Sequence, residues 1–212
     1  LDLCPGCLAE LPRIARPCHQ CGEPLPEAAP PGTRCGPCQR RPPAFDRCTA
    51  PLAYTGPVPM LVAGLKFHDR LAAGRLLGEL LVSHLLRRGG PLPELILPIP
   101  LHPRRLRQRG FNKALELALP LGRRLGIPID RHSCRRNRAT QPQTELDIKQ
   151  RRRNLRNAFA LAGTLPARHI ALVDDVVTTG STSGELARLL KRAGAERVEV
   201  WAAARALSRH PA

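Results

Sequence analysis

Apolar positions beyond the amino-terminal region recur at two spacings, one helical and one extended. Helical spacing over 58–88 predicts two helices, interrupted near 67–69. A third, amphipathic helix is expected over 112–126 and a fourth over 181–195. At the start of the fourth helix, a Ser or Thr followed by Glu185 fits the pattern of a capping box.

Short apolar runs lie between these helices and predict buried strands. They cover 95–101, 127–129, 169–173 and 197–204. Runs without polar alternation are typical of strands that are covered on both faces. Because strands alternate with helices along the chain, we expect an α/β fold with an open, mostly parallel sheet.

The charge balance narrows the choice of partner. The 212-residue chain has 34 Lys and Arg against 17 Asp and Glu, a formal charge of +17. This excess favours nucleic acid, phosphorylated small molecules or an acidic membrane surface, although an arginine-rich proteome would produce the same composition. Aromatic residues make up only 3% of the chain, so any contact with single-stranded nucleic acid would depend on backbone charge rather than on base stacking.

Membrane insertion and secretion find no support in the sequence. No apolar run approaches the roughly 20 residues that span a bilayer. No charged segment followed by an apolar core marks a secretory signal. We therefore expect a cytoplasmic location, whose reducing conditions bear on the interpretation of the cysteines.

Cysteines gather near the amino-terminal end in three Cys-x-x-Cys pairs. These pairs are Cys4 and Cys7, Cys18 and Cys21, and Cys35 and Cys38. Two intervening residues let both thiolates face one tetrahedral ion from a tight turn, so the spacing predicts structural zinc. A disulfide framework would need an oxidising compartment, and a thioredoxin-type pair would belong to a βαβ pattern that this segment lacks.

Three pairs provide one complete four-cysteine site and leave one pair over. The expected zinc ligands are Cys18, Cys21, Cys35 and Cys38. The first pair then belongs to a second ribbon begun further upstream, or it joins the second pair in a rival arrangement. On this basis residues 1–48 form a zinc-ribbon region and residues 49–212 form the α/β domain.

Two adjacent acids, Asp174 and Asp175, follow the predicted strand over 169–173, at the sheet edge where ligands gather. The next loop runs into a predicted helix start, where free backbone N–H groups favour a phosphate. The loop consists of small and hydroxyl residues, namely Thr178, Thr179, Gly180, Ser181 and Thr182. Carboxylates suit sugar hydroxyls, so the combination predicts a phosphorylated sugar as ligand; a solvated cap loop is the plain alternative. P-loop and Gly-x-Gly-x-x-Gly motifs are both absent.

The stretch IALVDDVVTTGSTS (170–183) resembles the signature with which type I phosphoribosyltransferases bind 5-phosphoribosyl 1-pyrophosphate (PRPP). The resemblance implies a sheet of that fold type. It also implies that Asp174 and Asp175 hold the ribose hydroxyls and take part in catalysis, while residues 178–182 surround the 5′-phosphate. Mg²⁺ is implied as the ion that accompanies PRPP.

Most of the chain is similar to the ComF family of competence-associated proteins. The similarity is carried by LPIPLHPRRLRQRGFNKALELA (97–118), RNRATQPQTELDIKQRRRNLRNAF (136–159), LKFH (65–68) and the upstream Cys-x-x-Cys knuckles. It implies a pyrophosphate loop with Arg104, Arg109 and Gly110, in which Arg109 is a catalytic candidate. The segment 131–157 would correspond to a loop that closes over PRPP. Its arginines at 151–156 fit a helix facing nucleic acid equally well.

Three functions remain open from the sequence. In the first, which the ComF resemblance implies, the protein binds PRPP and acts in DNA uptake or processing, where it meets single-stranded DNA. In the second, it is an active phosphoribosyltransferase of nucleotide or base salvage, with the zinc ribbon as a structural cap. In the third, it is a nucleic-acid adaptor with a vestigial PRPP site. A homodimer, or a partner from the competence machinery, is expected by analogy alone.

Overall fold

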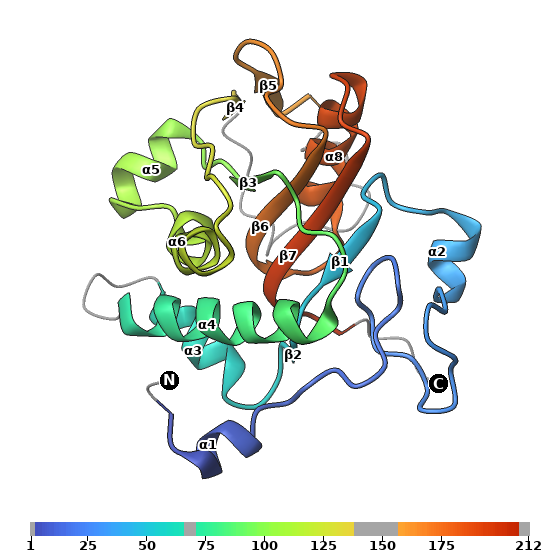
Figure 1. The fold of residues 1–212 in the computed structure, drawn as a ribbon. Coiled ribbons are helices and arrows are strands. Elements are labelled where there is room, and N and C mark those ends of the chain that lie inside the picture. Colours follow the sequence, from blue (N-terminus) through green and yellow to red (C-terminus); the bar gives the residue numbers. More distant parts are fainter. Residues whose placement is uncertain (1–2, 66–70, 138–156, 208–212) are drawn as a thin grey trace.

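The computed structural model describes residues 3–65, 71–137 and 157–207. A parallel sheet with the strand order β1-β7-β6-β3 forms its centre (Figure 1). The strands are β1 (Arg47–Thr49), β7 (Arg197–Arg205), β6 (His169–Val177) and β3 (Leu95–Pro98). The short β2 (Leu52–Ala53) pairs with β7 further along the edge that β1 occupies. The predicted α/β class with an open, mostly parallel sheet is confirmed.

Helices cover both faces of this sheet, which explains the unbroken apolar runs of its strands. Alternate residues of β6 point to opposite sides: Ala171 and Val173 pack with α3 (Val58–Gly64), α4 (Leu71–Arg88) and α6 (Lys113–Leu125). Ile170 and Leu172 pack with α8 (Ser181–Arg192). A strand buried on both faces has no position at which a polar residue would be solvated, so alternation is lost.

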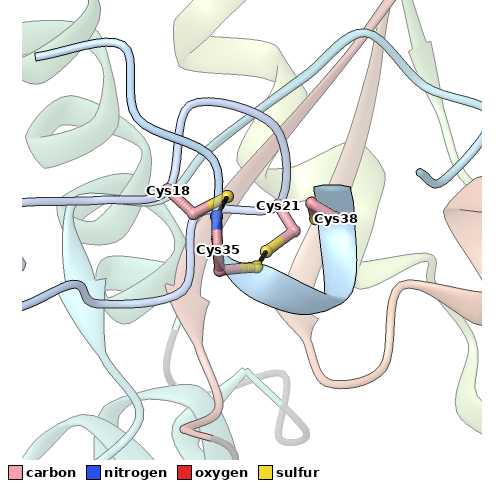
Figure 2. Close-up of side chains that lie close together, drawn as sticks. All are labelled: Cys18, Cys21, Cys35 and Cys38. Atoms are coloured by element: carbon pink, nitrogen blue, oxygen red, sulfur yellow. Dashed lines mark hydrogen bonds between the residues drawn. The ribbon is translucent and has the colours of Figure 1, made fainter. Parts of the chain in front are cut away.

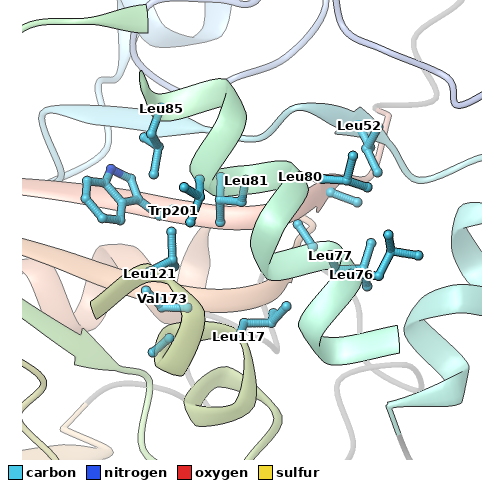
Figure 3. Packing of buried hydrophobic residues seen from close by; sticks show 14 of the residues in the cluster. Leu52, Leu76, Leu77, Leu80, Leu81, Leu85, Leu117, Leu121, Val173 and Trp201 are labelled. Carbon is cyan, nitrogen blue, oxygen red and sulfur yellow. The ribbon is translucent and has the colours of Figure 1, made fainter. Parts of the chain in front are cut away.

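The larger cluster of buried residues lies between β7 and the helix pair α4 and α6 (Figure 3). Trp201 of β7 is fully buried against leucines of α4. The two helices approach closely at Gly78, where an added Cβ would lie 2.3 Å from Cγ of Pro120. Helices α3 and α4 confirm the two helices predicted over 58–88; the predicted interruption at 67–69 lies outside the described residues.

Strand β6 is longer than the sequence predicted, and this changes the setting of the acid pair. It continues to Val177, which pairs with Arg205 at the end of β7. On its other side, β3 ends at Pro98 opposite Val173. Asp174 and Asp175 therefore lie within the strand rather than after it, beyond the end of β3, and Asp174 still pairs with Ala202 of β7.

Several local predictions were wrong. The strand expected over 127–129 is reduced to one parallel bridge between Ile129 and Ile96. The helix α5 (Pro103–Arg109) and the antiparallel hairpin of β4 (Cys134–Arg136) and β5 (Phe159–Leu161) were not predicted. Helix α8 has no side-chain cap, because Gly180 in the left-handed conformation precedes it; Glu185 instead accepts a hydrogen bond from the backbone N–H of Asn157.

The cysteine-rich region contains two short helices, α1 (Pro5–Ala9) and α2 (Gly36–Arg40), and packs against the sheet. The fully buried Phe45 belongs to the core under α8, and Leu11 belongs to the core under α4. Strand β1 runs across position 48/49, the expected boundary between the two regions. In the described part of the chain, no helix combines the length and apolar character needed to cross a membrane.

Candidate functional site

A cavity of about 370 Å³ opens at the carboxyl end of β6. It is bordered by the ends of β3 and β6, the start of α6, the loop before α8, and residues of α3, β4 and α8. Its polar lining consists of Tyr54, Arg109, Asn112, Lys113, Arg136, Asp174, Asp175, Thr178, Ser181, Thr182 and Ser183. Ligands of open α/β sheets bind at this edge, outside the carboxyl ends of the strands.

The acid pair is electrostatically uneven. Burial, together with the adjacent charge of Asp175, raises the pKa of Asp174 well above its usual range, and the positive charge of Arg136 only partly opposes this. Asp175 has a cation of its own, since its Oδ2 atom lies 3.1 Å from Nζ of Lys113. The pair thus contains one carboxylate with a close counter-ion and one that would gain from further positive charge.

Lys113 is a residue that the sequence reasoning missed. It begins α6 just after Asn112, whose Oδ1 accepts from the N–H of Ala114 and whose Nδ2 donates to the carbonyl of Ile99. Its side chain is only 10% exposed. Its position in the helix was the signal that was missed. Lys113 lies four residues before Leu117 and therefore on the buried face of the helix, where a charged side chain requires a partner of opposite charge.

Arg136 is the second missed residue. It is buried in β4, and its guanidinium lies 5.6 Å from the centre of the Phe159 ring across the hairpin. Because burial lowers the pKa of Arg136, with Arg105 adding to this effect, the site holds an arginine charge at a cost in solvation. The cavity therefore contains two buried cations, and the exposed Arg109 also lines it.

The loop before α8 approaches the cavity through most of its residues. Thr178, Gly180, Ser181 and Thr182 line the cavity. Thr179 does not line it, and its hydroxyl lies 2.7 Å from that of Ser181. Gly180 has a φ of +68°, which only glycine adopts without strain. The loop thus turns sharply and presents hydroxyls and the first turn of α8 to the cavity.

Some of the predicted ligand residues lie elsewhere. Arg104 is exposed on the first turn of α5, and Gly110 ends that helix in the left-handed conformation; neither lines the cavity. Of the predicted pyrophosphate loop, Arg109 and Asn112 at its end do so. The predicted closing segment falls largely within 138–156, outside the described residues, and so do the arginines at 151–156 and the LKFH residues 66–68.

The four cysteines Cys18, Cys21, Cys35 and Cys38 lie together (Figure 2), with all sulfur atoms within 4.8 Å of one another. Sγ of Cys18 accepts from the backbone N–H of Cys35 at 3.2 Å. Among the described residues this is the one cysteine cluster that could hold a metal, so the rival set containing Cys4 and Cys7 was wrong. Those two cysteines are exposed on α1.

The donor chemistry of this cluster fits a four-thiolate zinc site. Although burial opposes it, hydrogen bonds from backbone N–H groups lower the pKa of the Cys18 thiol to about 7. Burial raises the pKa of Cys21 to about 12, and it also raises the pKa of Cys38. A divalent metal displaces the thiol protons, so all four cysteines would be thiolates in the bound state although their pKa values differ without it. Four sulfur atoms placed this closely therefore suit a structural metal.

No family model matches the chain. The "DNA utilization protein YhgH" of Salmonella typhi is 41% identical over 209 residues, which cover 97% of this chain and 91% of that protein. "Competence protein F" of Haemophilus influenzae is 37% identical over 215 residues, covering 96% and 90%. The chain belongs to the ComF family.

The comparison with a solved structure is weaker than the comparison of sequences. A solved structure from Thermus thermophilus is 19% identical, covers 66% of this chain and 86% of its own, and has a TM-score of 0.37, which is too low to bear on the site. The two features of this ComF-family chain that its own geometry defines are the cavity with the acid pair and the four-cysteine cluster.

Proposed function

We propose that this chain binds PRPP in the cavity at the carboxyl end of β6. The observation that carries the proposal is the meeting of two carboxylates with an anion-binding loop in one cavity of about 370 Å³. Asp174 and Asp175 would accept hydrogen bonds from the ribose hydroxyls. Thr178, Gly180, Ser181 and Thr182 would hold the 5′-phosphate through hydroxyls and backbone N–H groups, and Thr179 would support Ser181 from outside the cavity.

The cations around the cavity suit the pyrophosphate part of the ligand. Arg109, Lys113 and Arg136 all line the cavity, and the last two are buried. Charges held in a partly desolvated site interact more strongly with phosphate oxygens than exposed ones do. Arg104 and Gly110, which the sequence added to this role, would need a different arrangement of α5 to reach the ligand.

Mg²⁺ fits the acid pair by its donor chemistry, because hard carboxylate oxygens are the ligands it prefers and the charge of Asp174 is only partly opposed by Arg136. The ion would neutralise charge shared between the carboxylates and the pyrophosphate. If the chain also transfers the phosphoribosyl group, Arg109 and the buried cations would stabilise the departing pyrophosphate, and the acids would orient the ribose. Such a salvage activity is the alternative function.

Titration calorimetry with PRPP and Mg²⁺ tests the binding proposal. Wild type should release or take up heat, and Asp174→Asn/Asp175→Asn should bind at least about tenfold more weakly, through lost charge-assisted hydrogen bonds. Glu196→Gln is the matched control, since this acid is exposed and remote from the cavity. No binding heat in wild type would overturn the proposal. A product assay with nucleobase acceptors separates binding from transfer.

We also propose that the chain acts in DNA uptake or processing on the cytoplasmic side and that single-stranded DNA is its partner. The names of the relatives, a DNA utilization protein and a competence protein, support this role. The charge of +17 supports a polyanionic partner. One structural zinc ion at Cys18, Cys21, Cys35 and Cys38 belongs to the same proposal, as the metal that folds the region beside β1.

A cationic cluster at the amino ends of the strands offers a contact for DNA. It consists of His19, Arg34, Arg47, Arg88 and Arg197. Burial, followed by the charges of the four arginines, lowers the pKa of His19. The arginine contribution means that the electrostatic potential at His19 is positive. Four of the five border an open cavity of about 390 Å³, whose two acids already pair with Lys191 and Arg168. Arg88 and Arg197 share the buried carboxylate of Glu199, so Arg34 and Arg47 are the cations of this cluster that we expect an incoming phosphate backbone to meet.

The salt dependence of DNA affinity tests this partner. The logarithm of the affinity for a single-stranded oligonucleotide should fall linearly with the logarithm of salt concentration, by about 0.7 for each phosphate contact. Arg34→Gln/Arg47→Gln should lower this slope, whereas Arg123→Gln, an exposed change on α6, should not. Neutralising the arginines at 151–156 tests the other candidate surface. A flat dependence in wild type would contradict DNA binding.

A further inference from the structure

Arg205, the last residue of β7, connects the cysteine cluster to the anion-binding loop. Its guanidinium is buried, with 7% of the side chain exposed. Nε donates to the carbonyl of Cys21 at 3.0 Å, and Nη2 lies 2.6 Å from a carboxylate oxygen of Glu23. Nη1 donates to the carbonyl of Val177 at 3.1 Å and to that of Thr178. One side chain thus holds together two segments that lie far apart in the sequence.

Both ends of this connection matter for a ligand. Cys21 offers its sulfur to the metal cluster and its carbonyl to Arg205. Thr178 is the first residue of the loop that borders the cavity. Since a guanidinium donates in fixed directions within one plane, the position of the knuckle and that of the loop cannot change independently while these bonds exist.

A second connection runs parallel to the first. Nε2 of Gln20, in the same knuckle, donates to the carbonyl of Phe45 at 3.2 Å. The ring of Phe45 in turn lies under the loop, where a Cβ added to Gly180 would be 3.3 Å from the ring atoms Cε1 and Cζ. The knuckle therefore supports the loop at both Thr178 and Gly180.

We propose that Arg205 is a positioning residue through which the metal-bound knuckle holds the loop 178–182 in its anion-binding conformation. Loss of the metal frees Cys21, the bond from Arg205 no longer has a fixed acceptor, and the loop loosens. The chain then binds a phosphorylated ligand in full only when its cysteine cluster is loaded. This inference rests on the proposed anion-binding function of the loop.

Hydrogen exchange of the full chain tests the coupling without any ligand. Removing zinc with a chelator should accelerate exchange of a peptide covering 176–184 about tenfold or more, because its supporting bonds become transient. A peptide covering β3 should exchange as before and acts as the internal reference. In zinc-loaded Arg205→Met, the loop peptide should exchange faster than in zinc-loaded wild type, and stripping should add a smaller acceleration than in wild type, because only the connection through Gln20 and Phe45 remains.

The matched control is Arg88→Met. Arg88 is also buried and also pairs with a buried carboxylate, that of Glu199, but it lies at the other end of the sheet. This variant should lose stability and keep wild-type loop protection. The coupling is overturned if stripping wild type leaves the loop peptide unchanged, or if it accelerates the β3 peptide equally. Even if Arg205→Met fails to fold, the wild-type experiment decides whether loss of the metal loosens the loop.

Calorimetry with PRPP separates this inference from the proposed function. Coupling with no PRPP binding in zinc-loaded wild type would remove the proposed function and leave the connection through Arg205 intact. Equal PRPP affinity in loaded and stripped wild type would overturn the coupling and leave the proposed function intact. Weaker binding after stripping, matched by weaker binding in zinc-loaded Arg205→Met, supports both.

Discussion

Nζ of Lys113 and Oδ2 of Asp175 lie 3.1 Å apart and join the start of α6 to the end of β6. The lysine is the more deeply buried partner, with 10% of its side chain exposed against 26% for the aspartate. The contact compensates Asp175, whereas the buried Arg136 partly opposes the charge of Asp174, so removal of Lys113 leaves Asp175 without its close counter-ion.

Lys113→Met should lower the free energy of unfolding by about 1–3 kcal/mol, because the carboxylate it leaves behind is partly desolvated. Urea unfolding at neutral pH measures this loss. Lys191→Met is the matched control, since its ion pair with Asp46 is more exposed, 34% and 38%, and should contribute less than about 1 kcal/mol. Equal losses in the two variants would mean that the Lys113 pair is not a buried one.

Asp174→Asn should stabilise the protein at neutral pH. The pKa of Asp174 is raised, so the folded state disfavours its charged form, and stability is lost as the pH rises through the range between the unfolded and the folded pKa. The amide is neutral throughout and avoids this loss. The melting temperature of the variant should therefore exceed that of wild type at about pH 8, and the difference should vanish towards about pH 4, near the ordinary pKa of Asp. A pH-independent difference would contradict this account.

The same substitution should weaken PRPP binding, so stability and binding change in opposite directions. That opposition is typical of a group placed for a ligand rather than for the fold, because the strain it stores is relieved only by the ligand or its ion. A variant that loses both stability and binding would instead indicate a structural aspartate.

The sheet and its helices followed from the sequence because local periodicity and burial on both faces agree. The runs at 95–98 and 170–173 are apolar at every position, and they form the outer strand β3 and the first part of the inner strand β6. The length of β6 could not be read in this way. Its last four residues are strand because β7 reaches Arg205, and that pairing is a tertiary fact which apolar spacing does not encode.

The candidate site also combines residues that local spacing predicts with residues that only the packed structure brings together. The acid pair and the Cys-x-x-Cys knuckles were found from local spacing, since each brings its own atoms together within a few residues. Lys113 and Arg136 reach the cavity from α6 and β4, and only the packed structure brings them to the acids. Arg205 lay inside no motif, and its significance depends on two segments that the sheet places side by side.

Cys38→Ser should reduce zinc affinity by more than about 100-fold, because a four-thiolate site with three ligands loses both a bond and its tetrahedral closure. Zinc content after dialysis should be one ion per chain in wild type and near zero in the variant. Cys134→Ser is the control, as this thiol is buried to a similar degree and lies outside the cluster. Cys4→Ser/Cys7→Ser should leave the cluster loaded, and zinc loss in that variant would restore the rival arrangement.

Gly180→Ala should destabilise the protein by about 1–2 kcal/mol and weaken PRPP binding, for two reasons that can be separated. Its φ of +68° costs any residue with a Cβ about 1 kcal/mol, and the added methyl group would press on the Phe45 ring at 3.3 Å.

Gly184→Ala, one turn further along α8, is the matched control. Its Cβ would meet only the end of the Arg188 side chain at 3.9 Å, so helix propensity should make that change neutral or stabilising. Phe45→Leu costs stability of its own, because Phe45 is buried; within that background Gly180→Ala should cost only the backbone part, and the difference between the two backgrounds is the steric part. If Gly180→Ala and Gly184→Ala unfold at the same urea concentration, the left-handed conformation of Gly180 is not required for the stability of the loop.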